Sequence, residues 1–504
     1  MLKLVVCVAL LALCHPIHGE KTNREARVLI LGAGGAGLQA ARRFHDAGMD
    51  DFIILEGADR KGGRVHDTEF GGMTVELGAA WASPSGTETL KIIEKLDLER
   101  WISDYDSHTY FNAAGDTVTD AAYERYDVFE PAMEHVVEIR DRMNDDDDIP
   151  DMSLRSSLRL GGWEALDALD NVIEWFDFDF EYAERTDVSS TRQSETFDDT
   201  YFMKDPGGLK QIFDDIAGFL DGPEFINHTH LNKKVSSIDY SNDVSVVVEC
   251  EDGTRYIGEY VLVTFSIGVL QRNHIQFTPS LPEWKRAVID KSRMGSYTQV
   301  YITFPTKFWD DVEWIVHASD RKGYYPIFLN LQAMGLYPSG TPMLMAHITG
   351  DESRRVEAQP ADQTKAEIEE VLRTLYGASS PGADGILVSD WSRNPLTEGA
   401  YSNWPVDISD DCFEKLESRV GRVFFAGEAT SSEYLGYVEG ALESGNREAN
   451  KIKECMADFS ECPIFEGQGL VCEKPSTGSA VSVRFNALMV SIATLVGLRL
   501  INFC

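Results

Sequence analysis

Three glycines near the N-terminus, Gly32, Gly34 and Gly37, have the spacing GxGxxG. In such a turn the first glycine permits the tight bend, the second lets backbone amides approach a pyrophosphate, and the third lets a helix pack closely on a strand. Glu56 follows about 20 residues later, where a carboxylate can bind the hydroxyl pair of a ribose. The pattern predicts a dinucleotide-binding site, in preference to a glycine turn without a ligand.

The elements around these residues are those of a β-α-β unit. An apolar strand is expected over residues 26–31, the glycine turn opens a helix, and a second strand ends at Glu56. The other predicted elements are helices over 123–175 (broken by NDDDDIP at 144–150) and 366–375, two strands joined by the hairpin signal Asp252-Gly253, and a β-rich segment over 292–308. The aspartates of NDDDDIP lack the spacing of a calcium loop, and no other cluster of metal ligands is found in the sequence, so no metal site is predicted.

Two further segments could complete a cofactor site. Arg64 follows Gly63 and could place a cation against a pyrophosphate. Far downstream, GRVFFAGEATSSEYLGYVEGALESG predicts a strand, a turn at Gly427-Glu428 and a helix starting near Tyr437. The N-terminus of such a helix can stabilise negative charge on a reduced ring, although a plain strand-turn-helix is the alternative.

Together these segments resemble the flavin-dependent amine oxidases, and the secreted polyamine oxidases most closely. The resemblance runs from about residue 27 to about residue 452 and includes YVLVTFSIGVLQRNHIQFTPSLPEW, GDESRRVEAQPADQTKAEI and GAYSNWPV. It implies an α/β fold with two lobes. A dinucleotide-binding (Rossmann-like) FAD domain would comprise 26–105, 200–292 and 400–458, and an interleaved α+β substrate domain would comprise 106–199 and 293–399.

The cofactor implied by the resemblance is FAD. Relatives that tether FAD covalently have a cysteine before the tyrosine of the GAYS-like motif, but Ala400 stands here, so non-covalent FAD is implied. Besides the three glycines of the turn, the residues assigned to FAD are Glu56 at the adenosine ribose, Gly63 and Arg64 at the pyrophosphate, Val235 at the adenine edge, Ala80 and Trp81 along the flavin, Glu428, Tyr437 and Val438 at the ribityl chain and ring, and Trp391 as a further contact.

On the substrate side, Tyr401 and Tyr437 match the two aromatic residues that hold the amine beside the flavin. Aromatic faces stabilise a cation and can align its carbon with the ring for hydride removal. Glu181 matches an acidic residue that lines the substrate tunnel of plant polyamine oxidases, and Tyr182 stands beside it.

Two positions depart from the family pattern. Ser83 stands where those enzymes have another carboxylate, so one anchor for a distal ammonium is missing. Gln299, two residues after the predicted substrate contact Tyr297, stands where the family has a lysine that is thought to help dioxygen accept electrons. Glutamine can hydrogen-bond a water but brings no positive charge to a reduced-oxygen anion. Gln299 is therefore expected in the active site, either slowing reoxidation or marking a protein that binds FAD without turning over.

Two functions follow from these assignments. The first hypothesis is an FAD-dependent oxidase of a polyamine-like amine, in which hydride passes to the flavin and dioxygen is reduced to hydrogen peroxide. The second is an FAD-binding homologue with weak or no oxidase activity that acts as an extracellular binding protein. An L-amino-acid oxidase would need an arginine for the substrate carboxylate, and none can be placed.

The charge and the two ends of the chain bear on its location. With 83 Asp and Glu against 46 Lys and Arg, the formal net charge is -37, which disfavours nucleic acid and anionic lipid as partners. Residues 1–19 have the pattern of a secretory signal peptide rather than a buried strand, and Asn227 lies in a glycosylation sequon. Residues 477–504 have the layout of a glycolipid (GPI) anchor signal, with a transmembrane helix as the alternative. We therefore expect a secreted or surface-anchored protein.

Of the eight cysteines, five lie between these terminal segments: Cys250, Cys412, Cys455, Cys462 and Cys472. The last three crowd around the C-terminal segment 459–476, where a disulfide is expected in an oxidising compartment. An odd number leaves at least one thiol unpaired.

Overall fold

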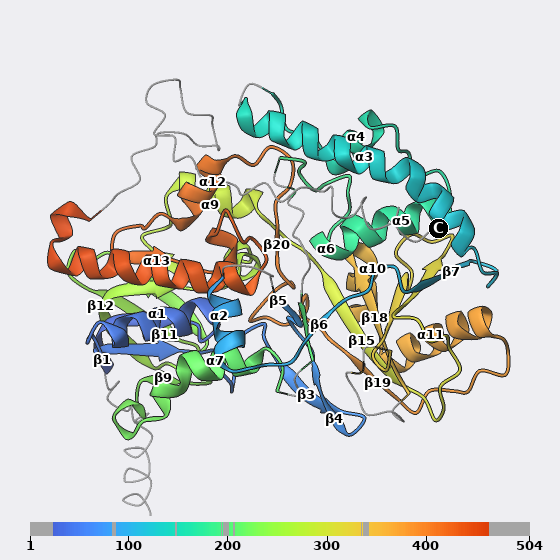
Figure 1. The fold of residues 1–504 in the computed structure, drawn as a ribbon. Helices are drawn as coiled ribbons and strands as arrows, with labels where there is room; N and C mark the ends of the chain where they lie inside the picture. Colours follow the sequence, from blue (N-terminus) through green and yellow to red (C-terminus); the bar gives the residue numbers. More distant parts are fainter. Residues whose placement is uncertain are drawn as a thin grey trace, which may run out of the picture.

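The computed structural model describes residues 24–82, 87–146, 149–192, 194, 201–204, 207–333, 335 and 342–462. Figure 1 shows two lobes side by side, each built on its own β-sheet. The predicted signal peptide, the predicted anchor signal, most of the segment 459–476 and Ser83 lie outside the described residues.

The first lobe is built on an eight-stranded sheet. Its strands, in sheet order, are β13 (Gln276–Thr278), β10 (Val235–Asp239), β11 (Val246–Cys250), β12 (Arg255–Val263), β1 (Arg24–Leu31), β2 (Phe52–Leu55) and β9 (Thr229–His230), with β21 (Val423–Phe425) also paired to β12. β1 runs parallel to β2 and β12, and the predicted hairpin at Asp252-Gly253 joins β11 to β12. The apolar end of β1, from Val28 to Leu31, is fully buried, as expected for a parallel strand covered on both faces.

Helices cover both faces of this sheet. On one face α1 (Gly35–Asp46) and α13 (Val438–Ala457) pack together, next to α2 (Glu88–Lys95) and α7 (Lys210–Ala217). On the other face lie α8 (Ile267–Gln271), α9 (Glu283–Lys291) and α12 (Asp410–Glu417). A Cβ on Gly445 of α13 would come within 2.3 Å of the Ala36 carbonyl, so the close contact of α13 with α1 depends on that glycine. The helix predicted to start near Tyr437 is α13.

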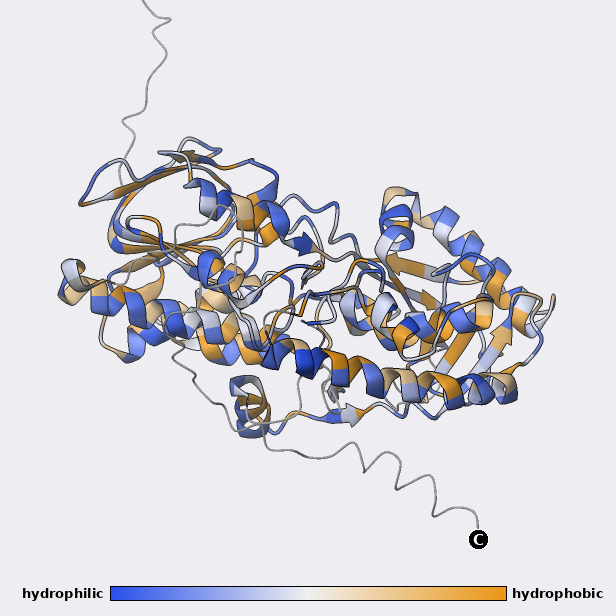
Figure 2. Cartoon of the chain, turned by 90° about the horizontal axis from the view of Figure 1, so that it is seen from above, coloured by the Kyte–Doolittle hydropathy of each residue, from blue (hydrophilic) through white to orange (hydrophobic). Residues whose placement is uncertain are grey.

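The second lobe is built on a six-stranded sheet with the order β19 (Gly385–Val388), β15 (Tyr297–Thr303), β18 (Met343–Thr349), β17 (Ile327–Asn330), β16 (Trp314–Ala318) and β7 (His108–Asn112). Neighbouring strands are antiparallel except β16 and β7. One face packs on α10 (Gly350–Ala358) and α11 (Ala361–Tyr376), and the other on α3 (Thr119–Asp145), α4 (Leu154–Leu160) and α5 (Ala168–Glu174). Seen from above, the strands are largely hydrophobic and the outer helices are banded hydrophilic and hydrophobic (Figure 2).

The helical region predicted over 123–175 contains α3, α4 and α5. The predicted break at 144–150 is confirmed, but a second break after α4 was not foreseen. It follows Gly161, where Gly162 has a φ of +95°, a left-handed conformation that glycine adopts readily and that ends a helix.

Short elements connect the lobes and surround their junction. They are the hairpin β3 (Asp67–Phe70) and β4 (Met73–Glu76), a three-stranded sheet of β5 (Trp81–Ala82), β8 (Tyr201–Met203) and β6 (Arg100–Ile102), the pair β14 (Arg293–Met294) and β20 (Ser402–Asn403), a π-helix over Trp175–Asp179, and α6 (Phe180–Tyr182). Strands of the eight-stranded sheet come from 24–278 and 423–425, and those of the six-stranded sheet from 108–112 and 297–388. The lobes are thus interleaved in the sequence, while the exact domain boundaries stay a prediction.

The cysteines of the described residues include a disulfide pair and a free thiol. Cys455 and Cys462 form a disulfide, which confirms a disulfide near the C-terminal segment. Cys412 is also disulfide-bonded, and Cys250 is a free, buried thiol. Asn227 of the sequon is exposed. None of the helices in the described ranges is long and apolar enough to cross a membrane.

Candidate active site

A pocket lies where the two lobes meet, and residues from both sheets line it. The predicted site residues on its wall are Gly32, Gly34, Glu56, Gly63, Arg64, Ala80, Trp81, Glu181, Tyr182, Val235, Tyr297, Gln299, Trp391, Tyr401, Glu428, Tyr437 and Val438. Gly37 is the one predicted residue that does not line it. A Cβ there would come within 2.0 Å of the Gly32 carbonyl, so Gly37 serves the packing of α1 on β1.

The glycine turn forms one end of the pocket. Gly32 has a φ of +118°, and a Cβ at this position would meet Thr264 Oγ1 at 2.4 Å. Gly34 is the N-cap of α1 and makes no side-chain cap. A Cβ on Gly34 would have only Gly63 Cα within 4 Å, at 3.9 Å, so the protein leaves open space there. The open helix N-terminus, with its unpaired N–H groups and positive dipole end, suits a phosphate group.

Glu56 holds the turn at the carboxyl end of β2. Its Oε2 accepts a hydrogen bond from the Ala33 amide at 2.7 Å, and its Oε1 accepts one from the Ala58 amide at 2.8 Å. Burial raises the pKa of Glu56, and these two donors and Arg60 oppose that shift. A carboxylate oxygen has two lone pairs, so each oxygen of Glu56 can accept one more hydrogen bond from a ribose hydroxyl.

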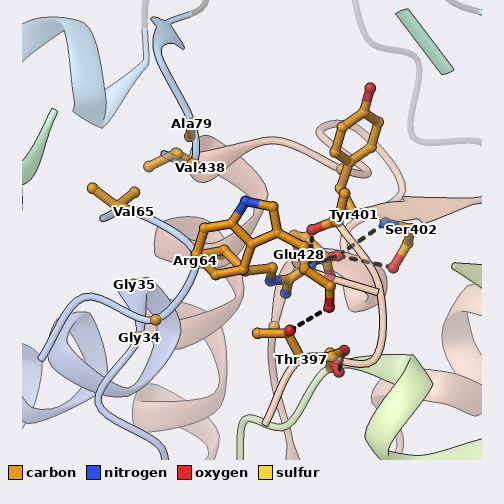
Figure 3. Close-up of a pocket in the computed structure, with 18 of the residues that line it drawn as sticks. Gly34, Gly35, Arg64, Val65, Ala79, Thr397, Tyr401, Ser402, Glu428 and Val438 are labelled. Carbon is orange, nitrogen blue, oxygen red and sulfur yellow. Dashed lines mark hydrogen bonds and ion pairs between the residues drawn. The ribbon is translucent and has the colours of Figure 1, made fainter. Parts of the chain in front are cut away.

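A partly buried ion pair also lines the pocket (Figure 3). Arg64 Nη1 donates to Glu428 Oε1 at 2.7 Å and to the Ala400 carbonyl at 3.0 Å. The backbone N–H and the hydroxyl of Ser402 donate to the same carboxylate oxygen at 3.1 and 2.9 Å. Burial raises the pKa of Glu428, but Arg64 and Ser402 outweigh it, and the pKa lies below its ordinary value. Glu428 is therefore ionised, and its position is set by residues from two other segments.

The pocket residues fit a long dinucleotide. Glu428 Oε2 is buried without a hydrogen-bond partner among the described residues, so an acceptor is available for a hydroxyl group of a ligand. Val65, Ala79 and Val438 lie on the side of the pocket away from Ser402 and Tyr401 and offer apolar surface to a ring system (Figure 3). The carboxylate at the end of β2, the open turn and the unpaired Glu428 oxygen supply groups for a ribose, a phosphate and a polyol, respectively.

The other end of the pocket is aromatic and acidic. The rings of Tyr297 and Tyr401 lie 5.9 Å apart between centroids, and the Tyr401 hydroxyl donates to the Glu181 carbonyl at 2.7 Å. The Tyr437 hydroxyl donates to Glu181 Oε1. Burial raises the pKa of Glu181 above its ordinary value, and the hydrogen bond from Tyr437 opposes this shift. A carboxylate among aromatic faces is an arrangement that can hold an ammonium group.

Gln299 lies on β15 with only 3% of its surface exposed. Its backbone amide donates to Ser389 Oγ at 2.9 Å, and its carbonyl accepts from the Ser389 amide at 3.0 Å. Gln299 lines the pocket, as expected for the residue that replaces the lysine of the family pattern.

The backbone before Glu181 has a feature that the sequence reading missed. The π-helix over Trp175–Asp179 directly precedes α6, and Ala183 ends α6 with a φ of +53°. Lys322 Nζ lies 3.2 Å from Glu174 Oε1 and 3.3 Å from Asp179 Oδ2. Glu174 is the residue before this π-helix, and Asp179 is its last residue. Short π-helical stretches are frequent at functional sites, and this one immediately precedes α6, the helix that carries Glu181. The sequence carried no signal for it beyond the acidic-aromatic run FDFDFEY.

Other residues on the pocket wall were not predicted: Tyr105, Phe180, Lys233, His274, Thr397, Ser402, Asn403, Trp404 and Glu433. Ser402 could have been found, because it follows Tyr401 directly. Glu433, an exposed carboxylate, stands in the loop between Glu428 and Tyr437, both of which were predicted. Within the described ranges no group of three or more His, Cys, Asp or Glu side chains could hold a metal ion.

Comparison with known proteins decides the family. Residues 36–453 match the family model of the flavin-containing amine oxidoreductases. This chain belongs to that family. It is 37% identical to polyamine oxidase 7 of Oryza sativa subsp. japonica over 445 residues, which cover 83% of this chain and 93% of that protein. It is 35% identical to polyamine oxidase 1 of Zea mays over 485 residues, or 90% of this chain and 95% of that protein.

Solved structures show a similar fold. A solved structure of putrescine oxidase, the wild type bound to putrescine, covers 86% of this chain and 100% of its own with a TM-score of 0.68 at 20% identity. The predicted two-lobed α/β fold is thereby confirmed. As a member of the flavin-containing amine oxidoreductases, the chain is an FAD-dependent amine oxidase, and its FAD is held without a covalent bond.

Proposed function

We propose that this amine oxidase acts outside the cell on a polyamine-like substrate and produces hydrogen peroxide. The observation that carries the proposal is the position of Glu181, a carboxylate at the aromatic end of the pocket that keeps one oxygen for a ligand. Its Oε1 accepts from Tyr437, Oε2 has no hydrogen-bond partner among the described residues, and Glu181 lines the pocket. A substrate with a second cationic group gains from this carboxylate, and a simple monoamine does not.

The chain's own residues would hold FAD as follows. The turn at Gly32 and Gly34 would take the pyrophosphate and Glu56 the adenosine ribose. Glu428 would accept from the polyol chain, with Arg64 keeping that carboxylate charged and in place. When bound, FAD supplies the electron sink for a hydride removed from the carbon next to the amine nitrogen, with dioxygen as the final acceptor and an imine, which water hydrolyses, as the organic product.

The roles of the remaining residues follow from their contacts. The rings of Tyr297, Tyr401 and Tyr437 would orient the amine by cation–π and packing contacts, which lowers the entropic cost of reaching the reactive geometry. Burial keeps the pKa of the three phenols well above the ordinary value, so they stay neutral donors. The exposed carboxylate of Glu433 would attract the far end of a polycation at the pocket wall.

A peroxide assay tests the proposal. Purified protein with bound FAD is incubated in air with spermine, spermidine, their acetylated forms and a monoamine of similar length. Peroxide with the polyamines, and much less with the monoamine, is the expected result. Peroxide formed equally well with the monoamine would contradict the polyamine assignment.

The second candidate function is an FAD-binding homologue with weak or no oxidase activity, and Gln299 is the observation that favours it. The side chain at this position carries no charge, so it stabilises a reduced-oxygen anion less than a lysine does. Retained yellow FAD with no peroxide from any amine would support this alternative.

Secretion is part of the same proposal. The apolar N-terminal segment, the exposed sequon at Asn227 and the disulfide Cys455–Cys462 are typical of secreted proteins. Expression in eukaryotic cells should deliver the protein to the medium or the outer surface, with a glycan lost in Asn227→Gln. Retention of the untagged full chain inside the cell would contradict it.

A further inference from the structure

Gln299 and His347 are direct neighbours across two antiparallel strands. The register of β15 and β18 pairs Gln299 with His347, and residues opposite each other in an antiparallel pair point to the same face with Cβ atoms about 5 Å apart. Tyr297, two residues before Gln299, points to that face as well. Its hydroxyl lies 2.7 Å from His347 Nδ1.

Polar atoms without a partner gather at this point. Among the described residues, Gln299 Oε1, His347 Nε2 and Trp81 Nε1 are buried and have no hydrogen-bond partner. The rings of Trp81 and His347 lie 5.6 Å apart between centroids. Buried polar atoms in folded proteins are almost always satisfied, so three of them on neighbouring side chains point to a bound molecule that satisfies them.

The protonation states can be assigned from the surroundings. His347 has 0% exposure and is packed against the rings of Phe180, Trp81, Trp314 and Tyr297. Burial lowers the pKa of His347 to about 3, so the imidazole is neutral. If Tyr297 donates to Nδ1, the single ring proton is on Nε2, and His347 presents a donor where Gln299 presents an acceptor.

The amide of Gln299 then has a definite orientation. Its oxygen is buried without a partner on the residue that faces His347 across the strands, whereas its nitrogen is not one of the buried unpartnered atoms, and Gln299 lines the pocket. We propose that one buried water links His347 Nε2–H to Gln299 Oε1, and that this link holds the Gln299 amide with its two N–H donors aimed into the cofactor pocket. His347 is thus a positioning residue that gives the chain a fixed neutral donor at the place of the family lysine.

The link is chemically balanced. The water accepts from His347 Nε2–H, donates to Gln299 Oε1 and can accept a second hydrogen bond from Trp81 Nε1–H, which gives it the three partners typical of a buried water. Without His347, the Gln299 amide can rotate about its last bond, and its donors lose their direction. The proposal concerns the cofactor end of the pocket, and it rests on the proposed function only through the dioxygen reaction.

A crystal structure of the FAD-loaded protein, at a resolution that shows ordered waters, tests the link directly. We expect one water within hydrogen-bond distance of both Gln299 Oε1 and His347 Nε2. Density that shows no water between these two atoms would overturn the proposal.

Variants test the consequence. FAD bound to the wild type, His347→Phe and His347→Gln is reduced chemically with dithionite, without any amine, and then mixed with dioxygen. We expect His347→Phe to slow reoxidation by about 3- to 10-fold, the effect of losing one positioned hydrogen bond, and to shift the absorption bands of oxidised FAD. His347→Gln can place an N–H near the position of Nε2, so it should restore both the reoxidation rate and the absorption bands of the wild type.

The control is His317→Phe on β16. His317 is also buried, its Nδ1 lies 3.3 Å from the Tyr325 carbonyl, and it does not line the pocket. We expect this variant to leave the FAD spectrum and reoxidation unchanged. Equal effects of His347→Phe and His317→Phe, or no effect of His347→Phe, would overturn the proposal. Because dithionite replaces the amine, a failure of the polyamine assignment leaves this test intact.

Discussion

The hydroxyl of Tyr437 donates a hydrogen bond to the carboxylate of Glu181, 256 residues earlier in the chain. Tyr437 is the N-cap of α13 in the first lobe, and Glu181 lies on α6, which packs with the six-stranded sheet of the second lobe. The pair therefore joins the two lobes at the aromatic end of the pocket. A cationic substrate bound there meets a phenol and a carboxylate that hold each other in position.

Loss of the Glu181 charge should change substrate preference. In Glu181→Gln we expect kcat/KM for spermine to fall by about 10- to 100-fold, the worth of one charge-assisted hydrogen bond, and that for a monoamine to change by less than about 3-fold. Glu433→Gln removes the same charge at an exposed position of the pocket wall and should cost much less. Steady-state kinetics on the three proteins decide the point, and equal losses for both substrates in Glu181→Gln would argue against an ammonium at Glu181.

The same carboxylate predicts a pH dependence. Burial raises the pKa of Glu181, so its charge is lost at a higher pH than in an ordinary glutamate, near 4.3. Since the carboxylate attracts the substrate only when ionised, kcat/KM for spermine should be full above the raised pKa and fall as the pH drops through it. This acid limb should disappear in Glu181→Gln. A pH profile with the same acid limb in both proteins would assign the titration to another group.

Restoring a positive charge at residue 299 should speed the dioxygen half-reaction. In Gln299→Lys we expect reoxidation of reduced FAD to become about 10- to 100-fold faster, because an ammonium stabilises a developing oxygen anion better than a neutral amide. Stopped-flow mixing of the reduced protein with dioxygen measures this rate. An unchanged rate would show that Gln299 does not limit reoxidation.

Two glycines of one turn should give different defects. Gly34 has a φ of −80° and open space around its Cα, so the apoprotein of Gly34→Ala should fold with an unchanged Tm. Its FAD binding should be about 10-fold weaker, because the added Cβ would occupy the space through which the pyrophosphate approaches the backbone amides. Gly37→Ala should lower the free energy of unfolding by about 3 kcal/mol, because its Cβ would collide with the Gly32 carbonyl. Thermal unfolding with and without FAD, together with an FAD titration, separates the two. A fall of the apoprotein Tm in Gly34→Ala would contradict this division of roles.

The sequence predicted those parts of the site that local chemistry specifies. The GxGxxG turn, Glu56 at the end of β2 and the helix behind Tyr437 each need particular residues at short spacing, and each is found on the pocket wall or beside it. The resemblance to a known family placed Tyr401, Glu428 and Gln299 on the same wall, although they come from different strands and loops.

Other relationships are set by tertiary packing and leave no local pattern. Ser402 donates to the Glu428 carboxylate only because β20 lies beside the turn that carries Glu428. His347 faces Gln299 only because of the register of β18 with β15. Lys322 forms ion pairs with Glu174 and Asp179 at the two ends of the π-helix before Glu181. Neither the periodicity nor the composition of the sequence predicts such a stretch. Long-range pairing of this kind is outside the reach of a single sequence.

The most direct test of the account is to mix the yellow FAD-loaded protein with spermine, spermidine and their acetylated forms without oxygen, and to follow the flavin absorbance. We predict that at least one of these polyamines bleaches the flavin, and that Glu181→Gln slows the bleaching by that polyamine. A flavin that stays fully oxidised with every polyamine would contradict the account.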